Sequence, residues 1–91
     1  MTTQLSDVVY VVITEQVCSM CHVDRQVKLI ELTGAFRGDL KREYFIRINK
    51  YTWVNSRCIN KRLIQRKIQL TDGSIHNVSR NSWKHFAAMP I

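Results

Sequence analysis

The sequence predicts a mainly β domain that ends in a short helix, and three local patterns support this prediction. Residues 8–13 form a continuous apolar run rich in β-branched side chains, which favours a buried strand. Residues 64–70 alternate with the period of a half-buried strand. Asp72-Gly73 follows, and this dipeptide is the strongest short-range signal for a β-hairpin.

The first third of the chain predicts three strands. Residues 8–13 form the first, and the polar residues 14–16 interrupt the pattern. Residues 17–23 and 26–32 then predict two strands of a hairpin. Asp24-Arg25 separates them and has the length of a two-residue hairpin connection.

A helical turn and a second hairpin follow. Residues 34–40 can form one helical turn that places Phe36 and Leu40 on the same side. Residues 44–48 alternate as a strand does, the polar residues 49–51 interrupt them, and apolar character then returns. Five aromatic side chains are predicted to lie in the core: Phe36, Phe45, Trp53, Trp83 and Phe86.

The end of the chain predicts a third hairpin and a helix. The strand at 64–70 turns at residues 71–74 and returns at 75–78. Ser79 is a typical N-cap for a helix from residue 80 to about 88. With 91 residues, 45% of them hydrophobic, three glycines and one proline, the chain suits one domain, residues 1–91.

Charge is strongly divided along the chain. Residues 41–84 hold eleven of the fourteen Lys and Arg residues but only two of the seven acids, which makes this part +9. Residues 1–40 hold three bases and five acids, or −2, and the two parts sum to the net charge of +7. A polarised charge of this size predicts a polyanionic partner, and the commonest one is a phosphate backbone.

No segment of the sequence predicts export or a membrane span. No apolar run approaches the roughly 20 residues of a membrane-spanning helix. Residues 8–13 have neither a preceding basic region nor a following cleavage site. We therefore expect a cytoplasmic protein whose cysteines, Cys18, Cys21 and Cys58, stay reduced.

Residues 18–22 match the C-x-x-C-H string that attaches c-type haem. Covalent haem attachment goes with export, which nothing here predicts. The string also lies in a predicted strand, where Cys18 and Cys21 point to opposite faces. The same geometry argues against a zinc site that adds His22 and Cys58. We expect buried structural cysteines and no metal or other cofactor.

The sequence also predicts no enzyme. His22, His76 and His85 lie at no spacing from a carboxylate or nucleophile that suggests catalysis. The two Ser-Arg pairs, at 56–57 and 79–80, resemble neither a nucleophile elbow nor a glycine-rich phosphate loop.

The order of residues resembles one known family along nearly the whole chain. Residues 44–55 (YFIRINKYTWVN) resemble the F-x-R-x-[HN]-[RK]-S-x-x-V-N signature of LytTR-type DNA-binding domains. Residues 68–74 (IQLTDGS) and 78–80 (VSR) look like that family's closing hairpin and its turn into the last helix. Residues 5–11 (LSDVVYV) resemble its opening L-x-D-I-x-Y-I strand.

The resemblance implies an elongated arrangement of short antiparallel strands in small sheets, with one helical turn in mid-chain and a C-terminal helix. It implies a bacterial transcription regulator that binds double-stranded DNA at promoter direct repeats, usually with bending. Such domains are often joined to a phosphorylatable receiver domain in a two-component response regulator, and a homodimer on DNA is possible. Two loops would read successive major grooves and a third loop the intervening minor groove.

Carried onto this chain, the resemblance makes Arg80 a major-groove reader and places Lys50 in the minor groove. The first major-groove loop corresponds to residues 14–16, with Gln16 as its reader. This match is poor because the loop looks about one residue short and Glu15 brings an acid near phosphates. Tyr51 stands where small hydroxyl residues are common in the family, so phosphate contacts there are in doubt.

General chemistry agrees with these roles. Arginine can donate two hydrogen bonds to O6 and N7 of guanine, and Asn81 beside Arg80 could read adenine. Lys50, between Asn49 and Tyr51, suits a narrow, negative minor groove. The densest basic run is predicted to supply phosphate contacts: Arg57, Lys61, Arg62, Arg66 and Lys67. Arg47 is predicted either as a DNA contact or as a partner of Glu31 or Glu43. The candidate DNA-binding residues are Gln16, Asn49, Lys50, Tyr51, Arg57, Arg80 and Asn81.

Two other functions remain open at the level of sequence. The first is an RNA-binding or ribosome-associated basic β-domain, which would stack bases on exposed aromatics. Tyr44, Tyr51 and Trp53 are candidates, although they form no alternating exposed patch. The second is a protein-interaction module with no role in nucleic-acid binding.

Overall fold

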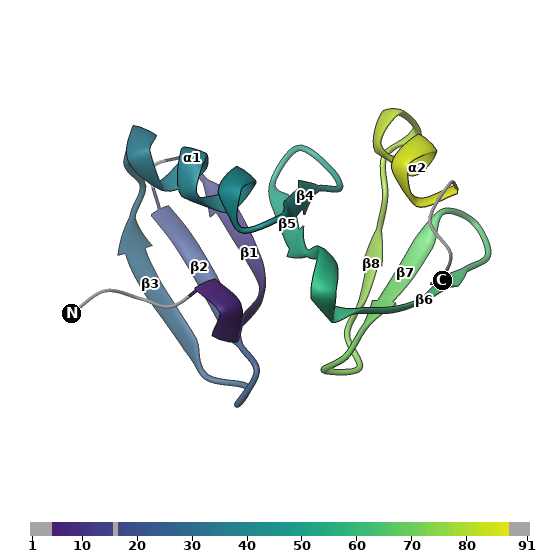
Figure 1. Ribbon diagram of the computed structural model, residues 1–91, viewed down its shortest axis with the longest axis horizontal. Helices are drawn as coiled ribbons and strands as arrows, with labels where there is room; N and C mark the ends of the chain where they lie inside the picture. Colours follow the sequence, from purple (N-terminus) through teal and green to yellow (C-terminus); the bar gives the residue numbers. More distant parts are fainter. Residues whose placement is uncertain (1–4, 16, 88–91) are drawn as a thin grey trace.

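The computed structural model describes residues 5–15 and 17–87, and in them it shows two antiparallel sheets side by side, each with a helix packed against it (Figure 1). The five-stranded sheet has the order β3-β2-β1-β5-β4, and the three-stranded sheet has the order β6-β7-β8. The prediction of a mainly β fold is confirmed. The strands of the first sheet are β1 (Val8–Thr14), β2 (Val17–His22), β3 (Val27–Glu31), β4 (Phe45–Arg47) and β5 (Thr52–Asn55). The remaining elements are β6 (Ile59–Leu63), β7 (Lys67–Leu70), β8 (Ile75–Asn77), α1 (Gly34–Arg42), α2 (Arg80–Ala87) and the 3₁₀ turns η1 (Leu5–Asp7) and η2 (Ser56–Cys58).

Helix α1 covers one face of the five-stranded sheet. Thr33 caps it by accepting a hydrogen bond from the backbone N–H of Phe36 at 3.2 Å. Phe36 and Leu40 both pack into the core beneath α1, as the sequence predicted, against Val11, Met20 and other side chains of the sheet. The helix has nine residues rather than a single turn, because the charged residues after Leu40 continue it on the solvent side.

The β2–β3 hairpin is confirmed, but its predicted two-residue connection is wrong. Strand β2 ends at His22 and β3 begins only at Val27, so the connection between the two strands has four residues. His22 N–H donates to the carbonyl of Gln26 at 2.9 Å, and Arg25 adopts a left-handed φ of 69°. Three of these residues, 23–25, lie inside the His22–Gln26 hydrogen bond, and a turn followed by a left-handed residue is the standard geometry of a three-residue hairpin loop. The residues Asp24-Arg25 alone did not reveal it.

The strand predicted at 64–70 is only half right. Residues 67–70 form β7, but residues 64–66 form the turn that joins it to β6, a strand the sequence did not predict. Gln65 and Arg66 adopt left-handed φ values of 61° and 55°, and the side chain of Ile64 is 83% exposed. Neither Gly nor Asn marks this turn in the sequence. The alternating pattern alone therefore led to a predicted strand that continues through the turn.

The β7–β8 hairpin and α2 form as predicted. Gly73, at a φ of 87°, occupies the left-handed position of the turn, and its N–H donates to the carbonyl of Leu70 at 3.0 Å. Ser79 caps α2, since its Oγ accepts a hydrogen bond from the N–H of Ser82 at 3.2 Å. The predicted last residue, Ala88, lies outside the described residues.

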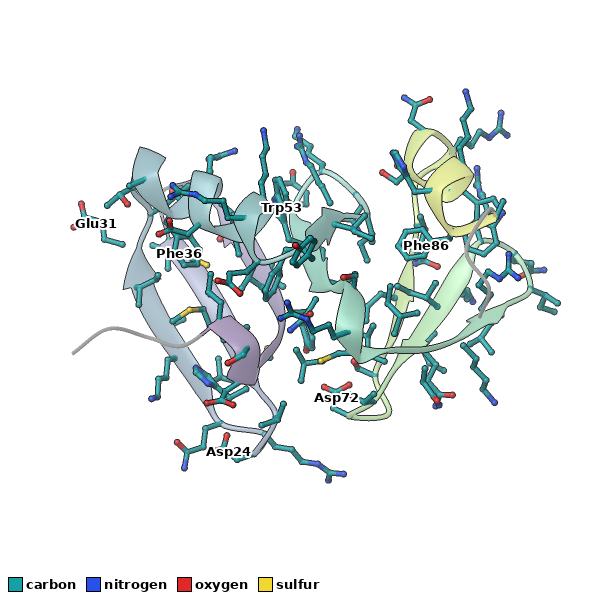
Figure 2. All side chains as sticks on the ribbon, viewed as in Figure 1. Asp24, Glu31, Phe36, Trp53, Asp72 and Phe86 are labelled. Atoms are coloured by element: carbon teal, nitrogen blue, oxygen red, sulfur yellow. The ribbon has the colours of Figure 1, made fainter. Side chains whose placement is uncertain are left out.

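A second core joins the two sheets. Its fully buried members include Val9 and Val54 from the first sheet, Ile68 from the second and Phe86 from α2. Figure 2 shows Phe86 between α2 and the three-stranded sheet. Because both sheets and α2 share this core, the loops at their ends have fixed relative positions. Within the described residues, no helix is both long enough and apolar enough to cross a membrane.

Candidate nucleic-acid interface

One edge of the molecule brings together segments that are far apart in the sequence. The β4–β5 loop, residues 48–51, and the start of α2 both lie at the upper edge in Figure 1. The end of β1 lies at the same edge, because Ile13 N–H donates to the carbonyl of Tyr51 at 2.7 Å. This edge therefore carries the β4–β5 loop, the start of α2 and the end of β1, which leads to the first loop that the resemblance assigned to DNA.

The shape of the β4–β5 loop is set by two side chains. Arg47 donates from Nε to the carbonyl of Asn49 at 3.2 Å and from Nη2 to the carbonyl of Lys50 at 3.0 Å. The Oδ1 atom of Asn49 accepts hydrogen bonds from the N–H groups of Tyr51 and Thr52, at 3.0 and 3.1 Å. The loop is thus held from both sides, with the Lys50 side chain left exposed.

Two hydrogen bonds then tie this loop to the approach to α2. Ser79 N–H donates to the carbonyl of Ile48 at 2.7 Å. The Nδ2 atom of Asn49 donates to the carbonyl of Asn77 at 3.1 Å. We call this pair of bonds the loop–helix bridge. It fixes where Lys50 lies relative to the first turn of α2.

A hollow of about 240 Å³ lies between the two bridged segments. Its lining residues are Arg47, Asn49, Lys50, Ser79, Asn81 and Ser82. A second hollow, of about 560 Å³, continues along the other side of Arg47, Asn81 and Ser82. Neither lining contains a carboxylate, so the field in this region is set by cations and neutral donors.

Three of the seven candidate residues line this hollow, and two more are their neighbours in the sequence. Asn49, Lys50 and Asn81 line it, and the exposed Arg80 lies between Ser79 and Asn81 in the first turn of α2. Tyr51 is 48% exposed, and the Lys50 Nζ lies 5.4 Å from the centre of its ring. Such a contact holds a cation near an aromatic face without removing it from solvent.

Arg57 does not belong to this group. Register pairs Phe45 with Asn55, so Arg57 lies just beyond the end of the β4–β5 hairpin that is opposite to the loop. Its Nη1 lies 3.9 Å from Glu43 Oε2, and its guanidinium lies 5.3 Å from the ring centre of Tyr44. Gln16, the remaining candidate, lies outside the described residues.

The structure adds two residues that sequence reasoning did not assign to the site, Ser79 and Ser82, and it places Arg47, whose role the sequence left open, in the lining. Arg47 bonds carbonyl groups of the neighbouring loop rather than Glu31 or Glu43, the two partners considered from the sequence. Ser79 was identified only as a helix cap. An Arg placed two residues before a polar Asn-Lys pair was the available signal for Arg47, but only coordinates show where its guanidinium points.

Charge is polarised across the fold as well as along the chain. Figure 2 shows Asp24 and Asp72 at the lower edge, opposite the β4–β5 loop and α2. Both aspartates serve their own hairpin turns, since Asp24 Oδ1 accepts from Gln26 N–H and Asp72 Oδ1 accepts from Ser74, each at 3.0 Å. These two aspartates therefore lie away from the β4–β5 loop and the first turn of α2.

The aromatic residues are poorly placed for stacking bases of a single strand. Trp53 is only 8% exposed and packs in the core beneath α1. Tyr44 and Tyr51 are exposed, but they lie at opposite ends of the β4–β5 hairpin. Recognition by stacking needs aromatics side by side on one surface, which these three side chains do not supply.

Cys18 and Cys21 lie on opposite faces of β2, as the strand period predicted. Burial raises the pKa of the Cys18 thiol to about 11, which opposes the thiolate form that metals bind. A hydrogen bond with Cys21 and burial raise the pKa of Tyr10 to about 12. In the described part of the chain, no three His, Cys, Asp or Glu side chains gather as a metal site would require.

The family model described as the LytTr DNA-binding domain matches residues 1–90 of the 91-residue chain. The search of curated proteins found no match. The match covers the β4–β5 loop, the loop–helix bridge and the first turn of α2, together with nearly everything that supports them.

Proposed function

We propose, from the premise that this chain belongs to the LytTR family of DNA-binding domains, that it reads double-stranded DNA with three reading elements. DNA binding in transcription regulation is the activity of the family, and the roles of individual residues are our proposal. Lys50 enters the minor groove, and Arg80 reads a base in the adjacent major groove. Asn81 assists Arg80, and the turn that contains Gln16 reaches the next major groove.

The observation that carries this proposal is the shared hollow between Lys50 and the first turn of α2. Two readers of neighbouring grooves must face the same side and keep a fixed separation. The loop–helix bridge supports both requirements, because it joins the Ile48 carbonyl and the Asn49 side chain to the backbone at residues 79 and 77. Rigid positioning matters because base edges are recognised by directional hydrogen bonds.

Chemistry supports the assignment of each reader. The guanidinium of Arg80 is exposed and can donate two parallel hydrogen bonds to O6 and N7 of guanine. Lys50 ends in a compact cation on a flexible stem, which suits the negative potential of a narrow minor groove. Asn81 carries the donor and the acceptor that an adenine edge requires.

The dimensions of the domain are consistent with three adjacent grooves. Its longest extent is 37 Å, and the three candidate segments are spread along the edge that follows this axis (Figure 1). One turn of B-DNA measures about 34–36 Å. A contact that runs from major groove to minor groove to major groove occupies about one such turn, so a single domain has the necessary reach.

The biological setting is also part of the proposal. We infer that the domain is the output module of a bacterial two-component response regulator and binds direct repeats in promoters. A receiver domain elsewhere in the full protein and a homodimer on DNA would both fit this role.

Selection from a random duplex library tests the proposal. We expect recovery of a defined sequence motif, and we expect that duplex to compete better than duplex RNA or single strands in a fluorescence anisotropy assay. Stronger competition by RNA would favour the RNA-binding alternative. If the domain bound no nucleic acid in moderate salt, the protein-interaction alternative would be favoured.

A further inference from the structure

We propose that the hollow between Lys50 and the first turn of α2 is the seat of a DNA phosphate, which Arg47, Ser79 and Ser82 contact from three sides. This inference rests on the proposed function and goes beyond it, because it assigns one backbone phosphate to a defined set of three residues. It also predicts which single phosphate of the target is the most important.

The first argument is geometric. A minor groove and the adjacent major groove are separated by one sugar–phosphate strand. If Lys50 occupies one groove and Arg80 the other, that strand must cross the surface between them. The hollow of about 240 Å³ occupies this position, and its lining comes from the β4–β5 loop on one side and α2 on the other.

The second argument is chemical. Two cationic side chains, Arg47 and Lys50, line the hollow, and the other four lining residues carry hydroxyl or amide groups. Side chains of these types make the backbone contacts that fix the register of a protein on DNA. The hollow therefore offers charge and hydrogen-bond donors, with no carboxylate to oppose a phosphate.

Arg47 can serve the loop and the phosphate together. Its hydrogen bonds to the carbonyls of Asn49 and Lys50 involve Nε and Nη2. A guanidinium has five N–H donors, so the two hydrogens on Nη1 are not used by these bonds. Because both bonds also fix the plane of the guanidinium, the remaining donors are pre-oriented for a phosphate oxygen.

The basic run at 57–67 is less well placed for the same task. Arg57 faces Glu43 and Tyr44 at the far end of the β4–β5 hairpin. Arg62 donates from Nη1 to the carbonyls of Phe86 and Ala87, at 2.9 and 3.0 Å, and so supports the end of α2. Both arginines therefore make their contacts away from the hollow, whereas Arg47 stabilises the loop that lines it.

The test uses Ser82→Asp, which places a carboxylate in the hollow. Position 82 is the third residue of α2 after the Ser79 cap, where an acid stabilises a helix. The variant should therefore fold normally and keep or raise the melting temperature. Gln26→Glu makes the same change of charge on an exposed residue of the β2–β3 connection and serves as the control.

Both variants and the unaltered domain are titrated with the selected duplex and with duplexes that carry one neutral methylphosphonate at each position in turn. For the unaltered domain, one position between the two read bases should weaken binding most. Ser82→Asp should lower affinity for the fully charged duplex roughly tenfold or more, as expected from a lost charge-assisted hydrogen bond. On the duplex that is neutral at that position, Ser82→Asp should have little further effect, while Gln26→Glu should behave like the unaltered domain throughout.

Two results would overturn the inference. One is a loss of DNA affinity in Ser82→Asp that stays the same whichever phosphate of the duplex is neutralised. The other is a folded Ser82→Asp variant with unchanged affinity. In either case the unaltered domain would still bind its selected duplex, so the proposed function would stand. Failure of the unaltered domain to bind any duplex would instead reject the proposed function, and this inference with it.

Discussion

In the proposed function Arg80 and Lys50 carry the recognition, and the residues that hold them are as important as the readers. Arg80 is exposed in the first turn of α2, where a cation gains nothing from the helix dipole. Its presence there has no stabilising explanation, which fits a role in binding. Lys50 is exposed at the tip of a loop whose backbone is fixed by Arg47 and Asn49.

Arg80→Ala should separate base reading from general attraction to DNA. We expect a loss of roughly 1–3 kcal/mol on the selected site and a much smaller loss on random duplex, because a guanine contact is sequence-specific. Anisotropy titrations of both duplexes at one salt concentration measure the difference. Equal losses on the two duplexes would make Arg80 a phosphate contact instead.

Asn49 should be a structural residue of the site. Asn49→Ala removes three hydrogen bonds, and we expect the free energy of unfolding to fall by about 1–3 kcal/mol. Asn49→Asp keeps the acceptor for Tyr51 and Thr52 but loses the donor to Asn77, so it should lose less. Urea denaturation of both variants, with the exposed Asn60→Ala as control, measures these changes; a loss no larger than that of the control would show that the bridge is unimportant.

The residue types at this site were predictable, but their connections were not. Matching the order of residues to a family identified Lys50 and Arg80 as candidates. The bond between Asn49 and Asn77 joins positions 28 residues apart, and no local pattern predicts such a pairing. For Arg57 the prediction from sequence was misleading. Its position in a basic run predicted a DNA contact, whereas the structure shows its guanidinium beside Glu43.

Secondary-structure elements followed from sequence wherever a turn carried its own signal. Gly73 supplies the left-handed residue of the β7–β8 turn, and Ser79 caps α2, so both elements were predicted. The β6–β7 turn uses Gln65 and Arg66 in left-handed conformations, which side chains of these types rarely adopt. Strand β6 was missed for a related reason, since its polar residues 60–62 show no alternation of apolar and polar side chains.

The contact between β1 and β8 should make stability depend on pH. Burial lowers the pKa of His76 below its usual 6.5, although the carboxylate of Asp72 opposes this shift. The ring packs 4.4 Å from that of Tyr10, and Nε2 lies 2.9 Å from Ser74 Oγ. The folded state therefore favours neutral His76, whereas the unfolded chain binds a proton near pH 6.5.

The sign of this effect is fixed by proton binding. Because the unfolded state binds more protons, the contribution of His76 to stability is complete above pH 6.5 and is lost as the pH falls toward its lower folded-state pKa. We expect His76→Gln to show a weaker fall in stability between pH 7 and pH 5 than the unaltered domain. Denaturation midpoints across this range measure it, with the exposed His85→Gln as control; identical pH profiles for His76→Gln and the unaltered domain would refute the assignment.

The arrangement of the whole molecule was the part least available from sequence. Strand β1 pairs with β5, a strand about 40 positions later, and this pairing places the end of β1 beside the β4–β5 loop. The core between the sheets then positions α2 at the same edge. Family resemblance implied small antiparallel sheets without this pairing, and alternation and turn signals alone predict strands without their order in a sheet.

The basic run tests how far DNA contact extends beyond the upper edge. Lys61 and Lys67 line a hollow on the three-stranded sheet together with the exposed Ile64 and Ile75. If both lysines contact phosphates, Lys61→Ala combined with Lys67→Ala should weaken binding to all DNA and reduce the slope of log affinity against log salt by about 0.9 for each lost contact. An unchanged slope would show that this surface does not face the DNA backbone.

Base analogues that alter one groove at a time test the central claim most directly. In the selected duplex, 7-deazaguanine removes a major-groove acceptor, and 2,6-diaminopurine in place of adenine adds a minor-groove amino group. We expect one 7-deazaguanine position to weaken binding by the unaltered domain but not by Arg80→Ala. We expect a diaminopurine position about five base pairs away, half of one helical turn, to weaken binding by the unaltered domain but not by Lys50→Ala. Sensitivity of both variants to the same positions, or no dependence on either residue, would contradict the placement of Lys50 and Arg80 in neighbouring grooves.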